Sequence, residues 1–302
     1  MNEPLSDYMR VGFVHFMLYP ECMGGDGPIL ETIRELSNDG DLEVIEVTKM
    51  NDAAVRRDVR DLANDTNTTL CFGAQPILLG GKLDLNHPDT AERQKAVDAV
   101  IEGFDQAVEL GAKSAAVLSG PVSDDKDAAH DRLVESLNTL CLAAEERGLG
   151  LAIETFDQVP FGKNCLIGST TDAVTVSEAV RKSHSTFGLM LDLSHLPLLN
   201  EASDYAIEAA GDHLIHAHIG NCAMDDPNHP AYGDNHPYFG APGTRNDVPE
   251  LAEYLRALVK FGYLSKADPK IVSFEIKPMP GDSAEIILAD SKRKLSEAWA
   301  LA

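Results

Sequence analysis

The sequence predicts an α/β protein that folds as a (β/α)₈ barrel, and three observations support this prediction. Strand-like and helix-like stretches alternate along nearly all of the 302 residues. The alternation repeats eight times, and no glycine-rich phosphate-binding turn marks the switch point of an open sheet. A chain of this length is ordinary for a single barrel, and no Pro/Gly/Ser-rich linker divides it. We therefore expect one domain over residues 1–302.

The predicted strands are short apolar runs, and several of them alternate apolar and polar residues with the period of two that a strand requires. In chain order they cover residues 11–18, 42–48, 68–72, 114–118, 150–156, 187–193, 214–219 and 271–276.

The predicted helices lie between these runs and place apolar residues three or four positions apart. They cover residues 27–36, 53–63, 90–110, 130–147, 171–183, 205–210, 248–261 and 283–300. Gly111 and Gly148 follow the third and fourth, as expected of helix C-termini. Ser169 or Thr170 precedes the fifth, where a side-chain oxygen can cap free N–H groups.

Four strand segments in the second half each carry one residue that can bind a metal. The segments are L-A-I-E-T-F-D, L-M-L-D-L-S-H, L-I-H-A-H-I-G-N and V-S-F-E-I-K-P, and the residues are Glu154, Asp192, His218 and Glu275. Each lies on the phase of its strand opposite the large aliphatic side chains. Three carboxylates and one imidazole suit Mn²⁺, Mg²⁺ or Co²⁺ better than a thiolate-bound metal. Because barrel active sites lie at the carboxyl ends of strands, we expect these residues to converge on one ion.

Composition excludes several classes of partner. A formal net charge of -24 at pH 7 repels phosphate backbones, so we expect no nucleic acid partner and no membrane partner. No apolar run is long enough to span a bilayer, and the first residues do not read as a leader, so we expect a cytoplasmic protein. Five widely spaced cysteines without a C-x-x-C pair indicate reduced packing residues.

The order of the candidate ligands resembles that of the xylose isomerase-like barrels, which include ketose 3-epimerases, hydroxypyruvate isomerases and inosose-processing enzymes. The resemblance rests on Asp192-Leu-Ser-His195, on the other three ligands and on the segment F-E-I-K-P. It implies that Glu154, Asp192, His218 and Glu275 bind one divalent ion, with Mn²⁺ as the first choice. It also implies that the two glutamates flank the reacting carbon of a small sugar, that His195 contacts a substrate oxygen, and that the protein is a homo-oligomer, either a dimer or a tetramer.

The chemistry is consistent with these residues. Moving a proton next to a carbonyl creates an enediolate, whose charge a divalent ion stabilises. Glu154 and Glu275 come from separated strands and can act as base and acid on opposite faces. Lys277 shares the phase of Glu275 and is a candidate to polarise a carbonyl or carry a proton, or else to form a salt bridge. Phe156 shares the phase of Glu154 and is a candidate substrate contact.

The chain departs from the ketose epimerases in two places. Pro160 lies near the position of their second glutamate, and no arginine follows His218 closely. The long loop expected at residues 221–246, between the seventh strand and its helix, contains candidates to replace these contacts, namely His236 and Arg245. His15 and Glu46 are further pocket candidates, and we interpret His216 as a core histidine.

Three interpretations of function follow. The first is a metal-dependent isomerase or epimerase of a ketose or keto sugar. The second is a lyase that uses the same enolising site on a 3-keto sugar or keto-glycoside, as a decarboxylase, a dehydratase or a deglycosidase with a small partner subunit. The third is a metal-dependent endonuclease or a silent barrel. The net charge argues against a nuclease, and the presence of all four ligands argues against a silent barrel.

Overall fold

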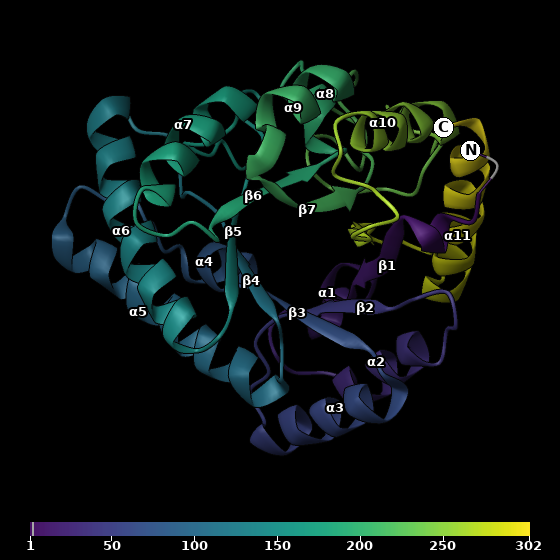
Figure 1. Cartoon of the computed structure of the whole chain (residues 1–302), viewed down its shortest axis with the longest axis horizontal. Coiled ribbons are helices and arrows are strands. Elements are labelled where there is room, and N and C mark those ends of the chain that lie inside the picture. Colours follow the sequence, from purple (N-terminus) through teal and green to yellow (C-terminus); the bar gives the residue numbers. More distant parts are fainter. Residues whose placement is uncertain (2) are drawn as a thin grey trace.

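The strands of the computed structural model, which describes Met1 and residues 3–302, form a closed parallel barrel in the order of the sequence. The register pairs each strand with the next, and β1 pairs with β8 to close the ring. Helices surround this ring (Figure 1). The strands are β1 (Met9–Val14), β2 (Val44–Val47), β3 (Thr69–Gly73), β4 (Ser114–Val117), β5 (Gly150–Glu154), β6 (Gly188–Asp192), β7 (Leu214–Ile219) and β8 (Lys270–Phe274). The barrel predicted from the sequence is confirmed.

The helices pack their apolar faces against the outside of the barrel, where most of the buried core lies. They are α1 (His15–Leu18), α2 (Ile29–Ser37), α3 (Ala53–Thr66), α4 (Gln75–Gly81), α5 (Thr90–Leu110), α6 (Lys126–Glu146), α7 (Thr170–Arg181), α8 (His195–Leu198), α9 (Ser203–Ala210), α10 (Val248–Lys260) and α11 (Ala284–Leu301). Three 3₁₀ turns, η1 (Leu5–Asp7), η2 (Pro20–Cys22) and η3 (Gly211–His213), complete the list.

Helix ends follow the predicted signals. Gly111 and Gly148 have φ values of 76° and 69°, in the left-handed region that terminates a helix at low cost. The side chain of Ser169 accepts from the N–H of Asp172, which caps α7. Each of the eight predicted helical stretches coincides with an observed helix, and α1, α4 and α8 are additional.

The first predicted strand is wrong at its C-terminal end. Residues 15–18 form α1, and the last residue of β1 that pairs with β2 is Val14, opposite Glu46. A continuous apolar run does not distinguish a strand from a short helix by its period, which explains the error. One consequence is that His15 faces Thr32 on α2, with 2.8 Å between Nε2 and Oγ1, and does not point into the barrel.

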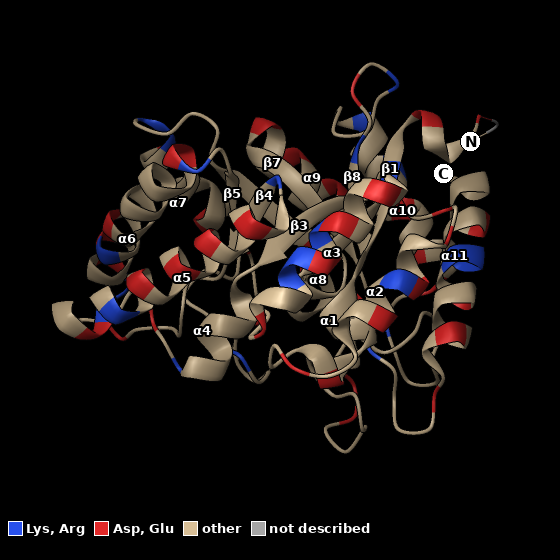
Figure 2. Cartoon of the chain, turned by 90° about the horizontal axis from the view of Figure 1, so that it is seen from below, with Lys and Arg blue, Asp and Glu red and all other residues tan. Residues whose placement is uncertain are grey.

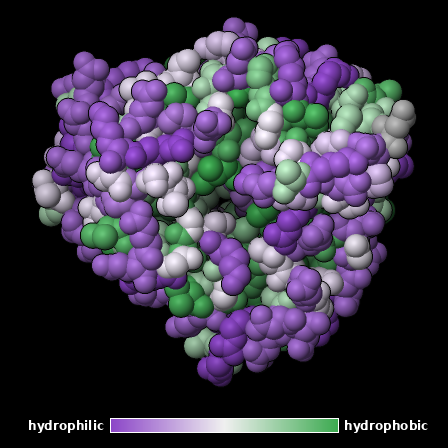
Figure 3. Space-filling model, in the orientation of Figure 1, coloured by the Kyte–Doolittle hydropathy of each residue, from purple (hydrophilic) through white to green (hydrophobic). Residues whose placement is uncertain are grey.

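Small inward-facing residues leave space inside the barrel. Cys71, Ala116 and Ala152 occupy positions that branched side chains usually fill in such barrels. A cavity of about 440 Å³ lies at the amino ends of the strands, with Arg10 and Lys113 among its lining residues. Figure 3 shows a hollow near the middle of one face of the molecule, with hydrophobic surface around it.

The segment between β7 and α10 folds back onto the barrel. The side-chain amide of Asn221 donates to the carbonyl of Tyr238 and to Oγ1 of Thr244, both at 2.8 Å. The amide of Asn246 donates to the carbonyls of Leu193 and Gly220 at 3.2 and 3.0 Å. These bonds fix both ends of the segment near the carboxyl ends of β6 and β7.

Charged side chains of both signs are interspersed over the outer helices (Figure 2), within a formal net charge of -24. Among the residues that the structure describes, no helix combines the length and apolar character needed to cross a membrane.

Candidate metal and active site

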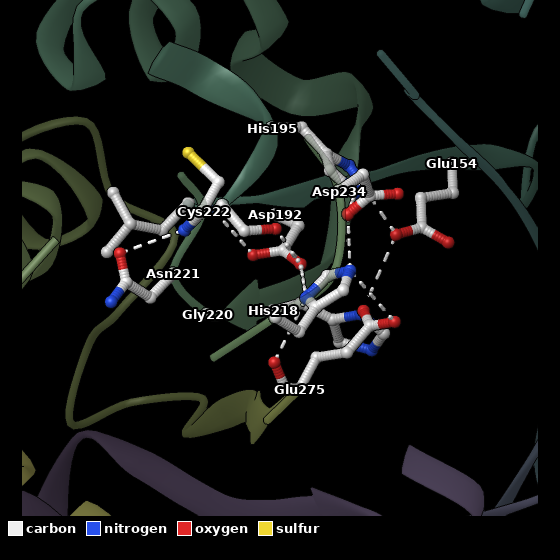
Figure 4. A network of polar contacts seen from close by, with 12 residues as sticks. Glu154, Asp192, His195, His218, Gly220, Asn221, Cys222, Asp234 and Glu275 are labelled. Carbon is white, nitrogen blue, oxygen red and sulfur yellow. Dashed lines mark hydrogen bonds and ion pairs between the residues drawn. The ribbon is translucent and has the colours of Figure 1, made fainter. Parts of the chain in front are cut away.

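The four predicted ligands converge at the carboxyl ends of four neighbouring strands (Figure 4). Glu154 ends β5, Asp192 ends β6, His218 is the penultimate residue of β7 and Glu275 follows β8. Asp192 lies directly opposite His218 in the register of β6 and β7. The backbone N–H of Glu275 donates to the carbonyl of Ile219 at 3.0 Å, which continues the pairing of β7 and β8. One ligand atom from each residue lies within 4.8 Å of the others.

The carboxylates of this group are buried and fixed by neighbouring groups. Asp192 accepts from the N–H and the hydroxyl of Ser194, both at 2.7 Å. Glu154 is only 1% exposed, and its Oε2 accepts from Nε2 of Gln75 at 2.8 Å. Its Oε1 is buried and has no hydrogen-bond partner among the described residues. This oxygen lies 3.8 Å from Nδ1 of His195 and of His218, too far for a hydrogen bond, so its burial carries a desolvation cost that a cation among the four ligands would offset.

His218 is oriented from behind by a fifth acid, Glu46. Nε2 of His218 lies 3.1 Å from both carboxylate oxygens of Glu46, and Nδ1 faces Oε2 of Glu275 at 2.7 Å. Glu46 also contacts Nε2 of His216 at 2.8 Å. When Nε2 of His218 donates to Glu46, Nδ1 is left as the metal-ligating nitrogen, an arrangement typical of metal-binding histidines. The interpretation of His216 as a bonded core histidine agrees with this geometry.

The two glutamates that the sequence assigns to catalysis, Glu154 and Glu275, differ in the pKa of their carboxyl groups. Burial, together with the negative charge of Glu275, raises the pKa of Glu154 to about 7. Burial acts in the same direction on Glu275, but the positive charges of His236 and His218 outweigh it and hold the pKa of Glu275 at about 2. Of the two side chains, Glu154 is therefore the one that more readily holds a proton, and Glu275 remains a carboxylate.

A second polar group adjoins the first and is centred on Asp234. Nδ1 of His195 faces the carbonyl of Thr155 at 2.7 Å, and Nδ1 of His236 faces the carbonyl of Glu275 at 3.0 Å. These carbonyls require an N–H at Nδ1 of each ring. Nε2 of His195 forms a hydrogen bond with Oδ1 of Asp234 at 3.0 Å, whereas Nε2 of His236 lies 2.5 Å from the same oxygen as an ion pair without hydrogen-bond geometry.

Asp234 has a third cationic partner, because it also pairs with Lys163. Burial acts to lower the pKa of His195, but the charge of Asp234 outweighs it and raises this pKa to about 10. His195 and His236 also join Asp192 as a group whose ligand atoms lie within 4.8 Å of one another. Asp192 belongs to both groups and therefore connects them into one buried charged network.

A cavity of about 500 Å³ opens onto this network at the carboxyl ends of the strands. Its lining includes Glu154, His218 and Glu275, together with Phe156 and Lys277, so these five predicted site residues are brought together. The backbone N–H of Lys277 donates to the carbonyl of His236 at 2.7 Å. Among the described residues, the Lys277 side chain has no ion-pair partner, so the predicted alternative of a salt bridge to Glu275 or Asp192 is absent.

Three predicted substrate contacts lie elsewhere. His195 and His236 are fully buried and do not line the cavity, and both ring nitrogens of His195 are hydrogen-bonded, whereas Asp234 between the two rings does line it. Arg245 is a correction: its side chain is 45% exposed, faces Asp225 at 3.5 Å and lines a separate surface hollow. The backbone N–H of Arg245 donates to the carbonyl of Cys222 at 2.9 Å, and its side chain pairs with Asp225 and not with a residue of the cavity.

Sequence analysis missed three residues of this site. Gln75 begins α4 directly after the short loop that follows β3, where a polar side chain at a carboxyl end is a usable signal. Asp234 lies two residues before His236, and the pair D-x-H within a long loop was a second signal. Lys163 lies in a loop without a glycine-rich helix start, so its sequence context gave little signal, and the structure places its amine 4.6 Å from the centre of the Phe156 ring.

Comparison with known proteins agrees with the fold. A D-psicose 3-epimerase from Ruminiclostridium cellulolyticum is 30% identical over 103 residues, which are 34% of this chain and 33% of that protein. The matched segment thus spans about a third of that relative. The structure of an L-ribulose 3-epimerase matches with a TM-score of 0.75 at 17% identity, covering 97% of this chain and 96% of the other. An IolI protein with a bound zinc atom matches with a TM-score of 0.74 at 17% identity, covering 96% and 98%.

A family model also matches the chain, over residues 35–293, and this range contains all four candidate ligands and every strand after β1. With this match, the chain belongs to the xylose isomerase-like TIM barrel family.

Proposed function

We propose that this protein is a divalent-metal-dependent isomerase or epimerase that moves a proton next to the carbonyl of a ketose or keto sugar. Glu154, Asp192, His218 and Glu275 would hold the ion, for which Mn²⁺ is the first choice and Mg²⁺ or Co²⁺ the alternatives. The observation that carries the proposal is the buried, unpartnered Oε1 of Glu154 within this four-residue group. The names of the relatives, two ketose 3-epimerases and a zinc-binding barrel protein, support the same class.

The chain's own residues supply the proton chemistry. A bound divalent ion would polarise the carbonyl and stabilise negative charge on its oxygen. Glu154 and Glu275 are the candidate base and acid, because they come from β5 and the end of β8 and both face the cavity. Both side chains line the cavity, where a substrate carbon can lie between them. Phe156 and Lys163 wall the cavity beside Glu154 and would exclude water.

A lyase acting on a 3-keto sugar or keto-glycoside is the second candidate. Two observations favour it. The segment that follows Glu154 contains no second glutamate. Lys163 of this segment forms an ion pair with Asp234, and both residues line the cavity. The same enolising step would then be followed by loss of a leaving group. A small partner subunit remains part of this alternative.

The endonuclease interpretation receives one point of support and one objection. Two further groups, Asp192 with His195 and His236, and Glu46 with His216 and His218, offer ligand atoms beyond the first four, as a site for several metals would need. The formal net charge of -24 opposes binding of a nucleic acid, so we keep the sugar substrate. Cytoplasmic location and assembly as a dimer or tetramer remain part of the proposal, and light scattering tests the assembly.

The experiment is incubation of the Mn²⁺-loaded protein in D₂O with a panel of ketoses and 3-keto-glucosides, followed by NMR. We expect deuterium to enter the carbon next to the carbonyl. Retention of all carbons indicates isomerisation, and release of an aglycone, water or carbon dioxide indicates a lyase. Chelation of the metal should stop exchange, and added Mn²⁺ should restore it.

The matched variants are Glu275→Gln in the site and Glu285→Gln on the surface of α11, where the side chain is exposed. Glu275→Gln should abolish exchange while weakening metal retention only partly, because three ligands remain. Glu285→Gln should behave as the wild type. Full exchange in Glu275→Gln would remove this residue from the mechanism, and no exchange with any substrate would refute the proposed activity.

A further inference from the structure

One wall of the active-site cavity is apolar. It is built from the end of β1, from α1 with the turn that follows, and from α4, and it consists of Val14, Phe16, Met17, Met23, Pro76 and Leu79. The charged groups, including Glu154, His218 and Glu275, line the same cavity. The cavity is therefore divided into a polar part that holds the candidate ligands and an apolar part beside it.

The apolar wall is separate from the packed core of the barrel. Val14, Phe16 and Met17 form their own small cluster, with Met23 packed against it. Leu79 is 43% exposed, which makes it one of the few large apolar side chains on the surface of the described residues. Its neighbours on α4 are Gly80 and Gly81, which have no side chain to cover it. An exposed apolar surface within a concave site is a common mark of a ligand contact.

A free ketose does not match this wall. Its surface is covered with hydroxyl groups, each of which loses hydrogen bonds to water when it contacts aliphatic side chains. The cavity of about 500 Å³ also exceeds what one sugar ring at the charged end requires, and it lies in the range of about 300–1,000 Å³ typical of sites for larger organic ligands. The space next to the charged residues is thus both large enough and apolar enough for a second, non-sugar group.

We propose that the substrate is a keto sugar that carries an aryl or alkyl substituent, with the sugar at the charged residues and the substituent against Met17, Met23 and Leu79. The inference rests on the proposed enolising site for the position of the sugar. It holds for either an isomerase or a lyase outcome, because both begin with the same bound keto sugar. Leu79 and Met23 are then specificity residues, and they take no part in proton transfer.

Charge favours a different occupant of this wall, a carboxylate. Lys49 and Lys277 also line the cavity, and neither forms an ion pair among the described residues. These lysines would favour a carboxylate in place of a neutral apolar group. The apolar side chains outnumber them on this wall, and the test includes a carboxylate probe to separate the two possibilities.

The experiment compares matched ligands on the Mn²⁺-loaded full chain by isothermal titration calorimetry. The probes are methyl, phenyl and carboxymethyl 3-keto-β-D-glucosides, which share one sugar and differ only in the substituent. We expect the phenyl compound to bind about tenfold or more tightly than the methyl compound, because an aryl ring gains from burial against the wall. The carboxymethyl compound should gain nothing over the methyl compound.

The variant Leu79→Ser should reduce the preference for phenyl over methyl to about threefold or less and leave methyl binding unchanged. The matched control is Leu142→Ser, which removes another exposed leucine, 54% exposed on α6 and outside the cavity lining, and should keep the full preference. Equal binding of methyl and phenyl compounds, or an equal loss for both in Leu79→Ser, would overturn the inference. A carboxymethyl preference that Lys277→Met removes would overturn it in favour of an anionic substituent.

Deuterium exchange on the same compounds separates this inference from the proposed function. Exchange into methyl and phenyl compounds with equal kcat/KM refutes the apolar subsite and leaves the enolising activity intact. Absence of exchange into any of them, together with a persistent Leu79-dependent preference for phenyl in binding, refutes the activity and leaves the subsite intact.

Discussion

Glu46 faces His218 with both oxygens of its carboxylate, each 3.1 Å from Nε2 of the imidazole. The two residues come from β2 and β7, which are not neighbours in the barrel, so the contact crosses its interior. Burial opposes the charge on Glu46, but the charges of His216 and His218 outweigh it and hold the pKa of Glu46 well below its ordinary value. The carboxylate is thus ionised and holds a proton on Nε2 of His218, the side away from the candidate metal ligands, so that a bound ion would replace the proton on Nδ1.

This relationship predicts that Glu46→Gln weakens metal binding although Glu46 is not one of the four ligands. A glutamine can donate as well as accept, so a proton would no longer be held on Nε2 of His218. We expect the dissociation constant for Mn²⁺ to rise by about 10- to 100-fold, the usual effect of removing a carboxylate behind a metal-binding histidine. Competition against a fluorescent chelator measures this constant.

The matched control for that variant is Glu43→Gln, which lies just before β2 and pairs weakly with Arg10 on the surface. It should leave the constant unchanged. A Glu46→Gln protein that melts like the wild type and binds Mn²⁺ with equal affinity would show that Glu46 does not orient His218.

The raised pKa of Glu154 predicts a pH-dependent stability of the metal-free protein. Between its ordinary value of 4.5 and its value in the fold of about 7, folded Glu154 retains a proton that the unfolded chain releases. Stability therefore falls as pH rises through this interval and does not recover above it. Glu154→Gln cannot ionise, so its stability advantage over the wild type should grow between pH 5 and pH 8 by on the order of 1–3 kcal/mol.

Guanidinium denaturation at both pH values, in the presence of a chelator, measures this difference. Excess Mn²⁺ should reverse the order at pH 8, because the wild type then gains stability from binding that the variant has partly lost. An advantage of Glu154→Gln that is the same at pH 5 and pH 8 would contradict the assigned pKa.

The sequence was sufficient for the barrel and for the convergence of the four candidate ligands, because both depend on periodic signals. Alternation along a strand fixes which face Glu154, Asp192 and His218 share, and the barrel brings the carboxyl ends together. It was not sufficient for α1, where the apolar run has no distinguishing period.

The positions of residues in the loop between β7 and α10 could not be predicted from the sequence, for a different reason. Asp234 is held at the site by its contacts with His195, His236 and Lys163, which are distant in the sequence, and no local pattern corresponds to such contacts. Arg245 pairs instead with Asp225 at the surface. His236 illustrates the same limit, since it was expected at the substrate and instead supports Asp234 from within the fold. Residues on strands could be assigned to a face, whereas residues on this loop could be assigned only to a region.

The carboxylate of Asp234 predicts the charge state of the two histidines that face it. In the metal-free wild type, His195 should remain protonated at pH 8, because the charge of Asp234 overcomes the effect of burial and raises the pKa of His195 to about 10. In Asp234→Asn the neutral amide no longer opposes burial, so this pKa should fall below 8 and the ring should be neutral there. NMR of the imidazole nitrogens across a pH titration distinguishes the two states.

The Asp234→Asn substitution also removes the shared partner of His195, His236 and Lys163, so it should lower the free energy of unfolding by about 3 kcal/mol or more. Asp225→Asn, at an exposed pair with Arg245, is the control and should change neither quantity. Persistence of the high His195 pKa in Asp234→Asn would mean that Asp192 and Glu154, rather than Asp234, hold its proton.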